Sequence, residues 1–154
     1  MADFPLAPGS TIGILGGGQL GRMLALAAAR LGFDVAVLDP EPDGPAARIA
    51  RLAIDGAYDD PAALKALADA SDVITFEFEN VPARAVEQLL ALGAEVAPGA
   101  RALAIAQDRI EEKTFLNAAG APTVAFAAAD DLASLRQAIE TIGTPCRHSP
   151  RAGS

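Results

Sequence analysis

The sequence has few of the features that mark secreted or membrane proteins. Its single cysteine, Cys146, excludes a disulfide bond within the chain and is typical of a reducing compartment. It contains no run of about 18 apolar residues, so no membrane-spanning segment is expected. The first ten residues have neither a basic start nor an apolar stretch. We therefore predict no secretory signal and a cytoplasmic location.

Positive charge is also scarce. The sequence has 12 lysine and arginine residues against 20 aspartate and glutamate residues, for a formal net charge of −8. Such a chain lacks the basic field that nucleic-acid binding usually needs, so we predict no nucleic-acid partner. Net charge does not decide whether there is a local anion pocket, because backbone amides at the start of a helix can hold a phosphate.

Apolar residues are abundant, at 51% of 154 residues, which is enough for a sizeable core in one domain, or in one domain plus part of another.

The stretch 11–23 is the segment around which the rest of the chain is organised. Residues 12–15 predict a short buried strand, and an alanine- and leucine-rich helix is expected from Gln19 to Leu31. Glycines with nucleotide-binding spacing stand at positions 16 and 18, between strand and helix, and at position 21, in the first turn of the helix. They would let a phosphate or a sugar approach the amides at the helix start.

Strands and helices continue to alternate up to residue 99. Further strands are expected over residues 34–39, 52–54, 73–78 and 95–97. Asp60 is predicted to cap a helix that has Pro61 first and ends at Ala70, and another helix follows Pro82 and ends near Gly93. This alternation requires right-handed crossovers and a parallel sheet. The predicted fold class is therefore α/β, Rossmann-like, with strand order 3-2-1-4-5.

The pattern changes from residue 100. Helices are expected over residues 100–106, 108–119 and 131–142, with an edge strand over 123–127. Asp108 and Glu111 form the expected cap of the second of these helices. The block is too small for a full domain and is predicted to be the beginning of one. Residues 147–154 break the pattern and form an aberrant tail.

Two loops flank the expected ligand-binding edge of the sheet. Residues 16–20 follow the first strand and residues 77–81 follow the fourth, on either side of the switch point where such sheets bind ligands. The second loop carries the carboxylates Glu77 and Glu79 on one side of a strand end, where they can accept bonds from ribose hydroxyls or an exocyclic amine. The alternative is that Glu77 is solvated and Glu79 caps the next helix. The switch-point position favours Glu77 as a ligand group.

Other polar residues have two interpretations each. Gln19 is either an ordinary first-turn residue or, because it adjoins the glycine turn, a ligand contact, which we favour. Arg22 is interpreted as a solvated helix residue. Asp39 either holds the ribose of NAD, as in a dinucleotide enzyme, or starts a loop. Cys146 and His148 have no partner cluster, so we predict no catalytic or metal-binding role for them.

Several segments together resemble one enzyme family. They are residues 16–23 (Gly-Gly-Gly-Gln-Leu-Gly-Arg-Met), 75–81 (Thr-Phe-Glu-Phe-Glu-Asn-Val), 107–109 (Gln-Asp-Arg), 113–116 (Lys-Thr-Phe-Leu) and 120–123 (Gly-Ala-Pro-Thr). Over roughly residues 10–146 the chain resembles the N-terminal part of N5-carboxyaminoimidazole ribonucleotide synthetase, an ATP-grasp ligase of purine biosynthesis. That family joins bicarbonate to the amine of 5-aminoimidazole ribonucleotide by way of carboxyphosphate, using ATP and Mg²⁺.

The resemblance implies that Gln19, Leu20 and Glu77 contact the aminoimidazole ribonucleotide and that Arg109 reaches the phosphates of ATP. It implies a pre-ATP-grasp, substrate-binding domain over residues 1–99, the start of an ATP-grasp domain over residues 100–146, and a homodimer for the intact enzyme. The first three residues lie in the loops that flank the switch point, and a planar guanidinium suits phosphate. Spacing alone does not single out Arg109, whose alternative role is an exposed helix charge.

The resemblance ends near Cys146. In the family an apolar strand with an ATP-binding lysine and a glycine-rich loop would follow, whereas this chain continues as Arg-His-Ser-Pro-Arg-Ala-Gly-Ser. The adenine pocket and the Mg²⁺-binding carboxylates are expected to be missing as well, so the chain alone is predicted to be inactive. We expect a shortened product, from a frameshift near Cys146 or from cloning or gene prediction that ended the chain early.

Two other functions fit the same glycine pattern. An NAD(P)-dependent oxidoreductase domain would use the three glycines together with Asp39. A related ATP-grasp enzyme, the formate-dependent glycinamide ribonucleotide transformylase, would act on a different ribonucleotide. That family has glutamate in place of Gln19, which favours the aminoimidazole interpretation.

Overall fold

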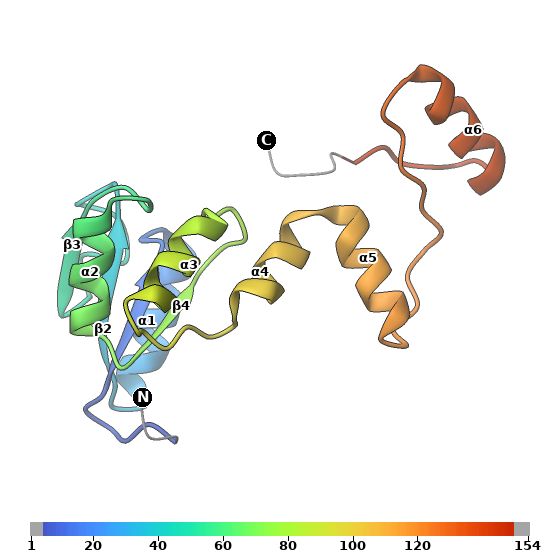
Figure 1. Ribbon diagram of the computed structural model, residues 1–154. Coiled ribbons are helices and arrows are strands. Elements are labelled where there is room, and N and C mark those ends of the chain that lie inside the picture. Colours follow the sequence, from blue (N-terminus) through green and yellow to red (C-terminus); the bar gives the residue numbers. More distant parts are fainter. Residues whose placement is uncertain (1–4, 150–154) are drawn as a thin grey trace. The chain divides into compact units, whose positions relative to one another are not determined.

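The computed structural model describes residues 5–149, in which strands and helices are interleaved up to β4 and only helices follow (Figure 1). The strands are β1 Thr11–Leu15, β2 Asp34–Asp39, β3 Leu52–Asp55 and β4 Val73–Phe76. The helices are α1 Gln19–Arg30, α2 Pro61–Ala70, α3 Ala83–Ala91, α4 Ala100–Gln107, α5 Arg109–Ala118 and α6 Leu132–Ile142. Contacts divide the chain into two compact units, Met1–Leu103 and Ala104–Ser154. Among the described helices, none combines the length and the apolar character that crossing a membrane requires.

The strands of the first unit form one parallel sheet in the order β3-β2-β1-β4. β1 is central, with β2 along one edge and β4 along the other. The predicted fifth strand is reduced to a single parallel bridge between Ile74 and Val96, which lies beyond β4. Pro98 follows closely and has no amide hydrogen to extend the pairing. The predicted α/β class and the predicted strand order are confirmed.

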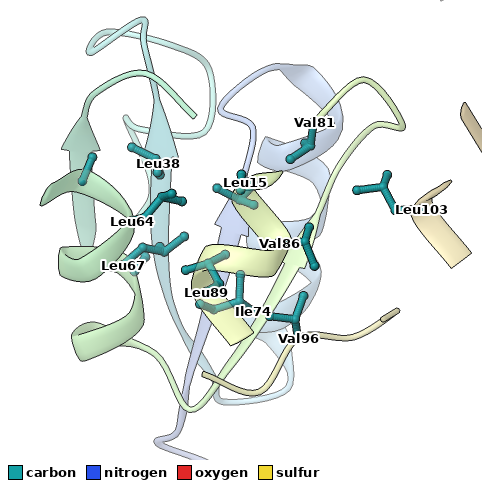
Figure 2. Packing of buried hydrophobic residues seen from close by; sticks show 13 residues of the cluster. Leu15, Leu38, Leu64, Leu67, Ile74, Val81, Val86, Leu89, Val96 and Leu103 are labelled. Atoms are coloured by element: carbon teal, nitrogen blue, oxygen red, sulfur yellow. The ribbon is translucent and has the colours of Figure 1, made fainter. Parts of the chain in front are cut away.

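Side chains alternate between the two faces of the sheet, and each face has its own core. α2 and α3 cover one face and α1 covers the other (Figure 1). Figure 2 shows the larger core, in which side chains of α2 and α3 point toward those of the strands. Its main members are Leu15, Leu38, Leu64, Leu67, Ile74, Val86 and Leu89. The smaller core joins α1 to the opposite face through Ile14, Ala25, Ala28, Val35 and Val37.

Three aspartates begin helices at the predicted positions. Asp60 Oδ1 accepts a hydrogen bond from the Ala62 amide at 2.9 Å, and Pro61 is the first residue of α2. Asp108 accepts from the second and third amides of α5. Asp131 accepts from the Ser134 amide at 2.7 Å, while Ser134 Oγ accepts from the Asp131 amide at 3.1 Å. This reciprocal capping box fixes the start of α6.

Two predicted strand segments are corrected by the structure. β4 ends at Phe76, two residues earlier than expected, so Glu77 lies in a bend beyond the strand. The edge strand predicted over residues 123–127 is wrong, because those residues have no strand assignment. A strand needs a neighbour to accept its hydrogen bonds, and no strand is present among the described residues of the second unit. Instead, the Thr123 amide donates to Asn117 Oδ1 at 2.8 Å.

Candidate functional site

A cavity of about 320 Å³ lies at the carboxyl ends of the strands in the first unit. The loops after all four strands contribute to its wall, which is where ligands bind in open parallel sheets. Its lining residues are Gly17, Gly18, Asp39, Pro40, Glu41, Pro45, Tyr58, Glu77 and Phe78. Three carboxylates among them make the cavity acidic.

The carboxylate of Glu77 is held by the glycine turn at the start of α1. The Gly18 amide donates to Oε1 at 3.2 Å, and the Gly21 amide donates to Oε2. The Glu77 amide in turn donates to the Leu15 carbonyl at 3.1 Å, which fixes the backbone of the loop beside β1. A negative charge at a helix N-terminus is stabilised by the free amides and the helix dipole. The amides that the sequence offered to a phosphate or a sugar are therefore partly occupied by a side chain of the protein itself.

At two positions of the turn only glycine fits, because other atoms of the protein lie where a Cβ would be. Gly16 has a φ of +110°, and a Cβ there would lie 2.3 Å from Glu77 Cγ. A Cβ on Gly21 would lie 2.5 Å from the Gly16 carbonyl oxygen and 2.8 Å from Glu77 Oε2. Glycine at both positions lets the first turn of α1 lie against the end of β1 and against the Glu77 carboxylate.

Asp39, the last residue of β2, accepts three hydrogen bonds from within the protein. Its Oδ2 accepts from the Gly17 amide at 2.5 Å and from the Tyr58 hydroxyl at 2.6 Å, and its Oδ1 accepts from the Glu41 amide at 2.8 Å. Burial, the hydrogen bond to Asp39 and the surrounding carboxylates raise the pKa of Tyr58 well above its usual range. The Tyr58 hydroxyl therefore stays protonated and keeps donating.

The predicted site residues lie in two different units. Glu77 lines the cavity of the first unit. Gln19 and Leu20 are the first two residues of α1, next to the glycine turn, and both are exposed. Arg109 belongs to the second unit, where its Nη1 donates to Glu112 Oε2 on the surface of α5. Their roles toward ligands stay predictions.

Sequence reasoning missed Tyr58 and found only part of the role of Asp39. Tyr58 follows the third strand by three residues, so its place at the carboxyl edge of the sheet was a usable signal. The loop-starting role of Asp39 is confirmed by its bond to the Glu41 amide. Its bond to the amide of Gly17, 22 residues away, was not predicted because only the tertiary fold brings the two residues together.

Comparison with known proteins gives a consistent result. A family described as "Ribonucleotide synthetase preATP-grasp domain" matches residues 9–107. A protein of Brucella melitensis, named N5-carboxyaminoimidazole ribonucleotide synthase, is 54% identical over 138 residues, which are 90% of this chain and 38% of that protein. The chain thus spans well under half the length of this relative.

Solved structures agree. The Staphylococcus aureus N5-carboxyaminoimidazole synthetase complexed with ADP has a TM-score of 0.84 and 42% identity, over 97% of this chain and 40% of that one. The Aspergillus clavatus synthase in complex with ADP and 5-aminoimidazole ribonucleotide has a TM-score of 0.78 and 32% identity, over 90% of this chain and 37% of that one. The chain therefore belongs to the ribonucleotide synthetase preATP-grasp family, and the relatives it matches are N5-carboxyaminoimidazole ribonucleotide synthetases.

Proposed function

We propose that the first unit is the ribonucleotide-binding part of a ligase that carboxylates 5-aminoimidazole ribonucleotide with bicarbonate and ATP. The observation that carries the proposal is the Glu77 carboxylate, which is fixed by two amides of the glycine turn on the wall of a cavity. The names of the relatives support the reaction, and the Aspergillus clavatus complex supports the ribonucleotide as ligand. Gln19 and Leu20 are proposed to contact the same ligand from the start of α1.

The charge of the cavity indicates which part of the ribonucleotide faces Glu77. Asp39, Glu41 and Glu77 all line it, so the phosphate group of the ligand would be repelled there. Ribose hydroxyls and an amino group are donors, and each carboxylate oxygen of Glu77 has acceptor capacity beyond the one amide it binds. Because the carboxylate is already immobilised, little conformational entropy is lost when the ligand binds.

ATP is proposed to bind mainly outside the first unit. Arg109 is the residue that we assign to its phosphates, since a guanidinium is a planar fork with five donors. Residues 5–149 contain no group of three or more histidine, cysteine, aspartate or glutamate side chains that could hold a metal ion. We assign none of these residues to Mg²⁺ and derive no step through it.

The remaining parts of the proposal are supported only by the resemblance to the ligase family. Residues 100–146 are assigned to the start of the ATP-grasp domain, and the ligase is proposed to act as a cytoplasmic homodimer. The nicotinamide alternative is not favoured, because the relatives are ligases. In addition, Asp39, which would hold the ribose of NAD, already accepts three hydrogen bonds within the protein.

The test is a calorimetric titration of the 154-residue chain with 5-aminoimidazole ribonucleotide. Glu77→Gln puts an amide NH₂ against backbone donors and removes the charge, so we expect affinity to fall roughly 10- to 100-fold. Glu87→Gln makes the same change at an exposed position of α3 and should bind like wild type. NADH should give no signal. The proposed role of Glu77 is refuted if Glu77→Gln, shown to be folded by circular dichroism, binds the ribonucleotide as tightly as wild type.

A further inference from the structure

Tyr58 connects three of the loops around the cavity. It is the only tyrosine of the sequence and lies on the cavity wall. Its hydroxyl donates to the same Asp39 oxygen that accepts from the Gly17 amide, at 2.6 Å and 2.5 Å respectively. One oxygen atom therefore joins the loops that follow β1, β2 and β3.

The loop that follows β4 also contacts Tyr58, through the ring of Phe78. The Tyr58 ring meets the Phe78 ring edge to face, with 5.7 Å between centroids. Phe78 adjoins Glu77, whose carboxylate is bound by the amides of Gly18 and Gly21. Because Gly17 and Gly18 are neighbours, a shift of the Asp39–Gly17 contact must move a donor of Glu77. The contacts form a closed ring around the cavity.

The two carboxylates in this ring have different tasks. Asp39 accepts from Gly17, Glu41 and Tyr58, so its acceptor capacity is largely used within the protein. Glu77 accepts one amide on each of its oxygens, and the residue lines the cavity. Within this ring Asp39 binds groups of the protein itself, whereas Glu77 stays available to bind the ligand. Without the Tyr58 hydroxyl, Asp39 would keep the Gly17 and Glu41 amides as donors but would be held less firmly.

We propose that Tyr58 and Asp39 are positioning residues, which hold the glycine turn and through it set the place of the Glu77 carboxylate for the ribonucleotide. This inference rests on the proposed function of the cavity and extends it to two residues that need not touch the ligand. Tyr58→Phe is the more selective substitution, because it removes only the hydroxyl and keeps the ring against Phe78. Asp39→Asn is the stronger one, because it turns an acceptor oxygen into a donor in front of other donors.

The first experiment needs no ligand. Amide resonances of Gly17, Gly18 and Gly21 are recorded in the ¹⁵N-labelled 154-residue chain and in its variants. Tyr58→Phe should move all three resonances and speed their hydrogen exchange, whereas Asp43→Asn, an exposed aspartate of the loop after β2, should leave them in place. Asp39→Asn should also lower the pKa of Tyr58 toward its ordinary value, read from tyrosinate absorbance, which one tyrosine and no tryptophan make unambiguous. Unmoved Gly18 and Gly21 resonances in Tyr58→Phe would overturn the proposal.

The second experiment measures 5-aminoimidazole ribonucleotide affinity. Tyr58→Phe should weaken binding roughly three- to tenfold, and Asp39→Asn by more, with Asp43→Asn unchanged. If wild type binds and a folded Tyr58→Phe binds equally well, positioning is refuted and the proposed function stands. If wild type does not bind, the proposed function of this chain fails, and the glycine resonances alone decide whether Tyr58 positions Glu77.

Discussion

Replacing Gly21 by alanine tests the closest backbone approach in the candidate site. The added methyl group would lie 2.5 Å from the Gly16 carbonyl oxygen and 2.8 Å from Glu77 Oε2. The first neighbour is backbone, which is hydrogen-bonded through the Gly16 amide to the Leu38 carbonyl at 3.0 Å and cannot simply rotate away. The helix or the turn must therefore shift, and the bond from the Gly21 amide to Glu77 is lost or lengthened.

The expected magnitude combines opposing effects. Overpacking costs about 1–3 kcal/mol, and loss of a hydrogen bond to a charged group costs about 1.5–3 kcal/mol. Alanine regains about 1 kcal/mol through its better helix propensity. We expect the free energy of unfolding to fall by about 1.5–5 kcal/mol, which for a domain of this size lowers the urea midpoint by about 1 M or more.

The assay is urea unfolding followed by circular dichroism, with Gly99→Ala as the matched control. Gly99 has no atom within 4 Å of an added Cβ, so that variant should unfold within about 0.5 kcal/mol of wild type. Helix propensity alone predicts that Gly21→Ala is more stable than wild type. A Gly21→Ala chain that is as stable as wild type, or more so, would refute the close approach of α1 to the end of β1.

Four further predictions concern stability. Leu89→Ala, at a fully buried position of the larger core, should cost about 2–5 kcal/mol in urea unfolding, whereas Leu90→Ala next to it, at an exposed position, should cost much less. Asp60→Ala should cost about 1 kcal/mol by removing the cap of α2, and Asp60→Asn should restore most of it. Hydrogen bonds from Ser134 lower the pKa of Asp131, so Asp131 stabilises α6 fully above its unfolded pKa of about 4 and loses this effect as pH falls through the lower folded pKa. Carbon chemical shifts of α6 should report the loss, and Asp131→Asn should remove the pH dependence. Burial and Asp39 raise the pKa of Tyr58, so its contribution to the free energy of unfolding is complete below about pH 10 and is lost as pH rises above that value. Above about pH 10 the urea midpoint should fall for wild type and much less for Tyr58→Phe.

The sequence by itself determined the α/β class, the strand order and the starts of three helices. The class and the helix starts depend on local signals: runs of β-branched residues, aspartates before helical stretches, and the glycine turn between a strand and a helix. The strand order was predicted from the usual arrangement of doubly wound sheets. The predicted edge strand over residues 123–127 failed because pairing depends on a neighbour, which local pattern cannot supply. The end of β4 was placed two residues late for a similar reason, since Glu77 turns to the glycine amides where the pattern alone would continue the strand.

Only the tertiary structure decided how the polar groups at the edge of the sheet are shared. Glu77 meets amides 56 and 59 residues away, Asp39 meets one 22 residues away, and Tyr58 meets Asp39 across 19 residues. No sequence spacing relates these partners. The sheet does, because parallel strands bring the loops at their carboxyl ends to one edge.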